Sequence, residues 1–159
     1  MRQQRYFSKV YLAKKLCLLV VFFLAAVPII LAQPKRATVQ ELKKIMDRQE
    51  DFLIVDVRGL KSYEKSHLPG AISLPVGELV DRHRELPRNK VIIFYCSWLA
   101  ENSSVRAAQI LLQNDLGFQP KLLQVLKGGI FAWRDAGFNL ESGLTVESKN
   151  KKLALWARL

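Results

Sequence analysis

The sequence predicts an α/β fold in which a mostly parallel sheet is flanked by helices on both faces. Two observations indicate this class. Short apolar runs rich in branched side chains, at 51–57 and 90–96, are typical of strands that are buried on both faces. Segments with the apolar spacing of helices separate these runs, and strands that alternate with helices pair in parallel. The chain has 159 residues, which is about the length of one domain.

The first predicted helix begins at Thr38. Thr38 and Glu41 have the spacing of a capping box, in which each side chain accepts a hydrogen bond from the other residue's backbone. The apolar residues Val39, Leu42 and Ile45 then fall on one side of the helix. This pattern predicts a short amphipathic helix that packs against the sheet.

The remaining elements alternate in the same way as far as residue 140. Proline and glycine residues separate them, because these residues favour turns and helix ends. The predicted order is a strand at 51–57, a turn and short strand at 66–75, a brief helix at 77–86, a strand at 90–96, a helix from near Ser103 to about Gly117, a strand at 121–126 and a helix at 130–138. Residues 141–159 form a C-terminal tail, which could pack on the domain or extend away from it.

The first 32 residues form a segment of their own. They contain five basic residues and no acidic one, and end in an uncharged run from Leu16 to Ala32. A basic start, an apolar run and a small final residue are typical of an export signal peptide. The run could instead be an uncleaved anchor, because its length as a helix, about 26 Å, is at the lower limit for crossing a bilayer. Both possibilities predict an exported, periplasmic or extracytoplasmic domain, with membrane contact through residues 16–32 only if the segment is uncleaved.

The charge of the rest of the chain does not indicate a nucleic-acid partner. Residues 33–159 hold 20 basic and 14 acidic residues, a net charge of +6. These charges are interspersed, and no aromatic-and-basic stripe or base-reading motif accompanies them. We therefore expect an ordinary solvated surface and no nucleic-acid binding.

Cys96 is the one cysteine outside the N-terminal segment. A domain with one cysteine cannot close an internal disulfide, and a free thiol is a liability in an oxidising compartment. Cys96 ends a predicted strand, and ligands bind beyond the carboxyl ends of strands in open α/β sheets. A functional thiol is therefore one interpretation. The other is a small buried cysteine that only fills space.

The loop after Cys96 is expected to bind an anion. Backbone N–H groups of the loop and of the next helix's first turn would converge there, and they favour a thiolate or an anionic persulfide. Serine hydroxyls can add donors, and one of Ser103 and Ser104 is expected to cap the helix. The residues predicted to bind substrate are Ser97, Trp98, Leu99, Ala100, Glu101, Asn102, Ser103 and Ser104.

Four motifs resemble those of rhodanese-like domains, in that family's order and spacing. They are DVR at 56–58, SHLPGAISLP at 66–75, FYCS at 94–97 and VLKGGIFAW at 125–133. The resemblance covers residues 38–140 and implies a rhodanese-like domain with a five-stranded, mostly parallel sheet. It also implies that Cys96 carries sulfur as a persulfide and that Asp56, Arg58 and His67 brace the active-site loop.

The loop departs from the family's usual pattern. Single-domain rhodaneses commonly have four residues between the cysteine and an arginine that is followed by serine or threonine. Here the loop is about two residues longer, and it contains no arginine. Rhodanese-fold phosphatases place an arginine after five residues, whereas Asn102 occupies that position here, beside Glu101. A phosphatase is not expected, because a cation must neutralise the transferring phosphoryl group.

The sequence thus predicts a sulfurtransferase. Cys96 takes sulfane sulfur from a small donor or a protein thiol and passes it to a thiol or cyanide acceptor. A loop without a cation favours a neutral or polysulfide donor, or a partner protein's thiol, over thiosulfate. The alternative is a non-catalytic module that binds a partner through the same loop. His67, His83 and one cysteine lack any metal-ligand spacing, so no metal and no cofactor are expected.

Overall fold

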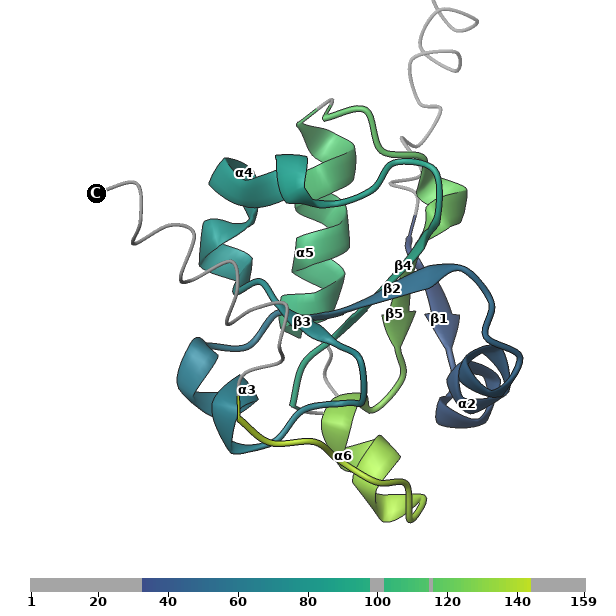
Figure 1. Cartoon of the computed structure of the whole chain (residues 1–159). Coiled ribbons are helices and arrows are strands. Elements are labelled where there is room, and N and C mark those ends of the chain that lie inside the picture. The colour runs from purple at the N-terminus through teal and green to yellow at the C-terminus, as the bar shows by residue number, and fades with distance from the viewer. Residues whose placement is uncertain (1–32, 98–101, 115, 144–159) are drawn as a thin grey trace, which may run out of the picture. The chain divides into compact units, whose positions relative to one another are not determined.

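The computed structural model describes residues 33–97, 102–114 and 116–143. They form a five-stranded, all-parallel sheet with the strand order β1-β5-β4-β2-β3 (Figure 1). The strands are β1 (Lys35–Ala37), β2 (Phe52–Asp56), β3 (Ile72–Ser73), β4 (Val91–Tyr95) and β5 (Leu123–Leu126). The helices are α2 (Val39–Asp47), α3 (Leu60–Lys65), α4 (Leu79–Arg82), α5 (Asn102–Gln113) and α6 (Gly129–Asp135), with 3₁₀ turns η1 (Val76–Glu78), η2 (His83–Glu85) and η3 (Pro120–Leu122). The predicted α/β class and the five-stranded parallel sheet are confirmed.

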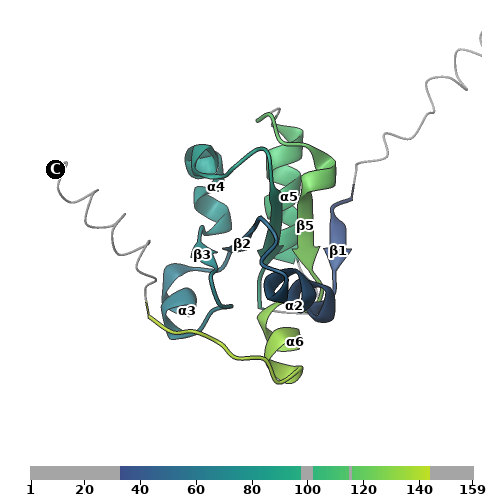
Figure 2. The same ribbon diagram turned by 45° about the vertical axis from the view of Figure 1, so that its right-hand side comes forward.

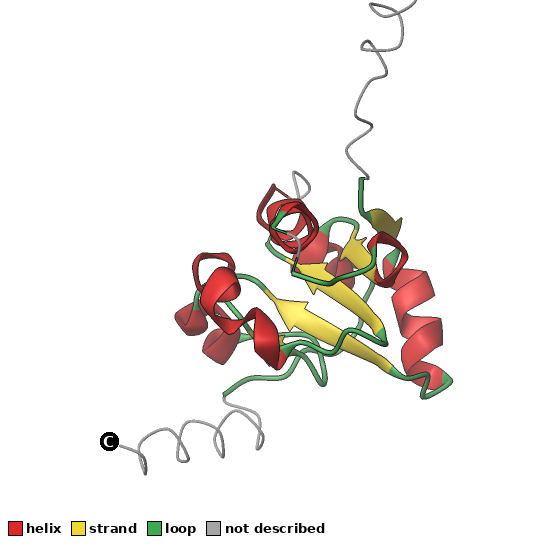
Figure 3. Cartoon of the chain, turned by 90° about the horizontal axis from the view of Figure 1, so that it is seen from above, coloured by secondary structure: helices red, strands yellow, loops and turns green. Residues whose placement is uncertain are grey.

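Helices cover both faces of the sheet, so that the strands lie between them (Figure 3). Side chains of α4 and α5 pack on one face, which we call the α5 face, and α5 runs along β4 and β5 (Figure 2). Side chains of α2, α3 and α6 pack on the opposite, α6 face. Along β4 the side chains alternate between these two cores: Phe94 and then Cys96 belong to the α5 face, and Ile93 and Tyr95 to the α6 face.

The capping box predicted at the start of α2 is confirmed. The Thr38 backbone N–H donates to Glu41 Oε2 over 2.7 Å, and the Glu41 N–H donates to Thr38 Oγ1 over 3.2 Å. Val39 and Leu42 are buried on the side of the helix that faces the sheet. Local sequence therefore places this helix correctly.

Some predicted boundaries are wrong. β1 was not predicted from the apolar pattern, because Lys35 and Arg36 are exposed and this strand pairs with β5 alone, at the edge of the sheet. The last strand begins at Leu123 rather than 121, since η3 occupies the positions before it. α5 begins at Asn102, so Ser103 and Ser104 lie inside its first turn and neither is its cap.

The described residues contain no helix that is long and apolar enough to cross a membrane. The predicted signal peptide or anchor, residues 1–32, lies outside the described part of the chain, as do residues 144–159 of the tail. The tail residues that are described pack on the domain: Glu141 pairs with His67 in an antiparallel bridge, and the Gly143 N–H donates to the Glu64 carbonyl over 2.7 Å.

The turn that leads from β5 into the first residue of α6, Gly129, lies directly against the end of β4. Gly129 has a φ of +56°, a conformation that L side chains rarely adopt. A Cβ atom at Gly129 would lie 2.1 Å from the Cys96 carbonyl oxygen. The Ile130 N–H donates to the same oxygen over 2.9 Å. The turn therefore needs glycine both for its φ and for its contact with Cys96.

We expect Gly129→Ala to destabilise the domain more than Gly137→Ala. Gly137 also has a positive φ, +78°, but nothing lies within 4 Å of a Cβ placed there. In Gly137→Ala, the control, the free energy of unfolding should fall by about 1–2 kcal/mol because alanine disfavours a positive φ. In Gly129→Ala it should fall by about 1–3 kcal/mol more, because the new methyl group clashes with the Cys96 carbonyl. Urea unfolding of the two variants measures the difference. Equal losses would contradict the close approach to Cys96.

Candidate active site

Cys96 lies at the carboxyl edge of the sheet, immediately after β4. Its side chain is 7% exposed and belongs to the α5-face core. The sulfur lies 3.6 Å from the hydroxyl oxygen of Ser104, which is fully buried in the first turn of α5. The thiol thus lies at the positive end of a twelve-residue helix, beside a hydroxyl that can donate to a sulfur anion.

The structure brings together some of the residues predicted to bind substrate. Ser97 and Ser103 are half-buried, Asn102 is exposed, and the Ser104 hydroxyl lies within hydrogen-bonding reach of the sulfur. Trp98, Leu99, Ala100 and Glu101 lie outside the described residues, so their roles stay predictions. Arg106 is exposed on α5.

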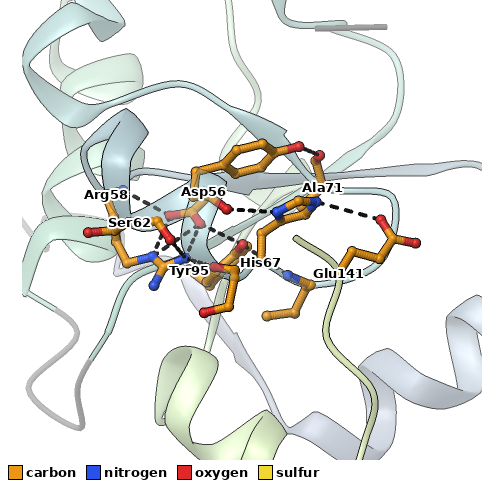
Figure 4. Close-up of polar contacts among 10 residues, drawn as sticks. Asp56, Arg58, Ser62, His67, Ala71, Tyr95 and Glu141 are labelled. Carbon is orange, nitrogen blue, oxygen red and sulfur yellow. Dashed lines mark hydrogen bonds and ion pairs between the residues drawn. The ribbon is translucent and has the colours of Figure 1, made fainter. Parts of the chain in front are cut away.

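A buried carboxylate stands beside this site, on the α6 face of the sheet. Asp56 ends β2, is 0% exposed, and lies opposite Tyr95 in the register of β2 with β4. Arg58 binds it through two side-chain nitrogens, Nε to Oδ1 over 2.9 Å and Nη2 to Oδ2 over 2.5 Å (Figure 4). The Tyr95 hydroxyl donates to Oδ2 over 2.7 Å. Because the charge is paired and hydrogen-bonded, it can be kept in the core.

This cluster connects three segments of the chain. Arg58 also donates from Nη2 to the Ser66 carbonyl over 2.6 Å, and the Tyr95 hydroxyl accepts from the Leu68 N–H over 3.2 Å. Burial, reinforced by the negative charge of Asp56, raises the pKa of Tyr95 above its usual value, so the phenol stays protonated and remains a donor. Asp56 and Arg58 therefore fix the backbone on which Cys96 sits without contacting its sulfur.

His67 is held on the same face by Tyr63 and Glu141. Its ring stacks on Tyr63 with 3.9 Å between ring centroids, and Nδ1 lies 2.8 Å from the Tyr63 carbonyl oxygen, which can only accept a hydrogen bond. Nε2 lies 3.6 Å from Glu141 Oε2. Because His67 packs with the α6-face residues while Cys96 packs on the α5 face, the two do not form a catalytic pair.

Sequence reasoning missed three residues of this region. Tyr95 was assigned only to an apolar strand, although a buried tyrosine hydroxyl usually needs a partner and Asp56 ends the preceding strand. Gly129 was identified as part of a turn but not as a contact of Cys96. Glu141 had no local signal, because its pairing with His67 joins positions far apart in the sequence.

Within the described residues, no group of three or more His, Cys, Asp and Glu side chains is placed to hold a metal ion. What the arrangement offers is one sulfur nucleophile, a helix N-terminus, a serine hydroxyl and a rigid backbone. These are the parts needed to stabilise a sulfur anion.

Comparison with known proteins matches residues 38–136 to the rhodanese-like domain. A sulfurtransferase of Allochromatium vinosum is 31% identical over 98 residues, which are 62% of this chain and 86% of that protein. A crystal structure of the BH2092 protein from Bacillus halodurans has a TM-score of 0.61 at 33% identity, covering 68% of this chain and 77% of that one. An HTH-type transcriptional regulator of Mycobacterium tuberculosis is 33% identical over 108 residues, 65% of this chain; these span 44% of its own length.

We expect Tyr95→Phe to destabilise the domain more than Tyr63→Phe. Both hydroxyls are buried, but Tyr95 donates to a carboxylate and Tyr63 to the Ala71 carbonyl. Loss of a hydrogen bond to a charged group lowers the free energy of unfolding by about 1.5–3 kcal/mol, and loss of one to a neutral group lowers it by about 0.5–1.5 kcal/mol. The free energies of urea unfolding at neutral pH measure both. A larger loss for Tyr63→Phe would contradict the central place of Asp56.

Proposed function

Because the chain belongs to the family of rhodanese-like domains, we propose that it is a sulfurtransferase that carries sulfane sulfur as a persulfide on Cys96. The observation that carries the proposal is the position of the thiol. Its sulfur lies 3.6 Å from the Ser104 hydroxyl, at the first turn of α5 and at the edge of the sheet where α/β proteins bind ligands. The similarity to a sulfurtransferase over 86% of that protein's length supports the same activity.

The proposed transfer has two steps. The Cys96 thiolate attacks the outer sulfur of a donor R–S–SH; the new S–S bond forms, the donor's S–S bond breaks, and the electron pair leaves on R–S⁻. An acceptor thiolate R′–S⁻ then attacks the outer sulfur of Cys96–S–SH, which yields R′–S–SH and returns Cys96 as a thiolate. Each step exchanges one S–S bond for another, so neither needs an oxidant or a reductant.

The residues around Cys96 have separate roles in this proposal. Ser104 donates to the sulfur anion, and the N-terminus of α5 adds partial positive charge. Asp56, Arg58 and Tyr95 hold the ends of β2 and β4 in place, and the Gly129 turn holds the Cys96 carbonyl. The thiolate is thus presented in a fixed position, which favours an in-line attack on a bound donor.

A second candidate is a module that binds a partner without transferring sulfur. The observation that favours it is the loop itself, since residues 97–104 hold no basic residue and one acidic residue, Glu101. In such a module, partner binding would survive the loss of the Cys96 thiol. In a sulfurtransferase, sulfur loading would not.

We expect Cys96 to accept one sulfur atom. The full chain with Cys17→Ser, which leaves Cys96 as its single thiol, is reduced and then exposed to polysulfide or, separately, to thiosulfate. Intact-mass spectrometry should show one added sulfur atom that a reductant removes, and the further change Cys96→Ser should abolish it. If neither donor loads a folded protein whose thiol is free, the sulfurtransferase proposal fails and the binding module becomes the better account.

We expect Ser104→Ala to slow the reaction of Cys96 with iodoacetamide by about fivefold, because one hydrogen bond of about 1 kcal/mol to the thiolate is lost. Ser103→Ala, the neighbouring serine on the same helix turn, is the matched control and should leave the rate unchanged. The rates are measured in the Cys17→Ser chain at constant pH. Equal rates for both variants would show that Ser104 does not stabilise the thiolate.

A further inference from the structure

The proposed site needs a positive charge that its loop does not supply. Persulfides, polysulfides and thiosulfate are largely anionic at neutral pH, and a Cys96 thiolate repels an approaching anion unless a cation lies nearby. Glu101 is the one charged residue of the loop 97–104. Arg58 already donates hydrogen bonds to Asp56 and to the Ser66 carbonyl, on the opposite face of the sheet. A cation from another element would favour the binding of such a donor.

The register of β4 with β5 brings one lysine beside Cys96. The last pair of the two strands is Phe94 with Val125, and counting two positions further along each chain aligns Cys96 with Lys127, the first residue of the turn after β5. The Lys127 N–H donates to the Ala37 carbonyl over 2.8 Å and thereby extends the pairing of β5 with β1 by one residue. The backbone of Lys127 therefore still follows the path of the strand.

The alternation of β5 sets the face on which Lys127 lies. Leu123 and Val125 pack in the α5-face core, and Leu126 packs in the α6-face core. Alternation continued one residue past the end of β5 assigns Lys127 to the α5 face, which is the face of Cys96. Neighbouring strands are about 4.8 Å apart, so the two side chains start from adjacent positions at the same edge of the sheet.

The lysine is available for a ligand. Lys127 is exposed, whereas Cys96 is buried. No hydrogen bond or ion pair joins its ammonium group to any other residue that the structure describes. The turn that follows is held against Cys96 by the Ile130 N–H and by Gly129, so the backbone carrying the lysine cannot move far from the sulfur.

We propose that Lys127 is the donor-binding cation of this site and that it selects anionic sulfane-sulfur donors, persulfide or polysulfide anions, for attack by Cys96. The inference rests on the proposed function and adds its substrate class. Lysine suits this role because its ammonium is a point charge on a flexible stem, which follows the outer sulfur as it moves from donor to Cys96. A single lysine matches a donor with one negative charge better than the thiosulfate dianion.

Two alkylating reagents of similar size test this inference without relying on sulfur transfer. In the full chain with Cys17→Ser, the rate at which anionic iodoacetate alkylates Cys96 is compared with the rate for neutral iodoacetamide. Lys127→Gln should lower the iodoacetate rate about threefold relative to the iodoacetamide rate, the effect of one unit charge about 6 Å away in water. Lys127→Arg should keep the wild-type ratio. Lys121→Gln removes an equally exposed charge from η3, at the opposite end of β5, and should not change the ratio.

Polysulfide loading of the same variants then separates this inference from the proposed function. Loading that is slower in Lys127→Gln and restored in Lys127→Arg supports both. An unchanged iodoacetate-to-iodoacetamide ratio in Lys127→Gln, or an equal change in Lys121→Gln, overturns the role of Lys127 even if Cys96 still carries sulfur. A changed ratio in a chain that takes up no sulfur overturns the sulfurtransferase and, with it, the assignment of a sulfur donor to Lys127.

Discussion

The buried carboxylate of Asp56 is the constraint on which the rest of the site depends. An ionised carboxylate in a core is tolerated only when it is paired and hydrogen-bonded. Arg58 and the Tyr95 hydroxyl satisfy it, and through them the ends of β2 and β4 and the segment around Ser66 and Leu68 are joined. Removing any one partner would leave the others buried without a counterpart, so the edge of the sheet forms as a unit.

Two consecutive residues divide the structural and chemical tasks. Tyr95 and Cys96 follow each other at the end of β4, and their side chains therefore lie on opposite faces of the sheet. On the α6 face Tyr95 is locked to Asp56, and on the α5 face the Cys96 sulfur meets Ser104. The polar network can therefore be rigid and largely buried without taking up space beside the thiol.

The proposed role of Lys127 would let this fold supply the positive charge from a different element. In single-domain rhodaneses an arginine commonly follows the cysteine within the loop, and this chain has no arginine there. The parallel sheet brings several strand ends to one edge, so a residue that follows β5 can stand beside a residue that follows β4. In the proposal, Lys127 and Cys96 are two such residues.

The sequence by itself determined the elements and the position of the thiol within them. Apolar runs, the Thr38–Glu41 capping box and four motifs predict the α/β class, the order of most elements and Cys96 at a strand end, because these signals are local. Tertiary structure decided the rest. β1 carries exposed basic residues and is a strand only because β5 pairs with it. The partners of Asp56 and the contact of Gly129 with Cys96 follow from strand register and from side-chain alternation across segments distant in the chain, which no local pattern encodes.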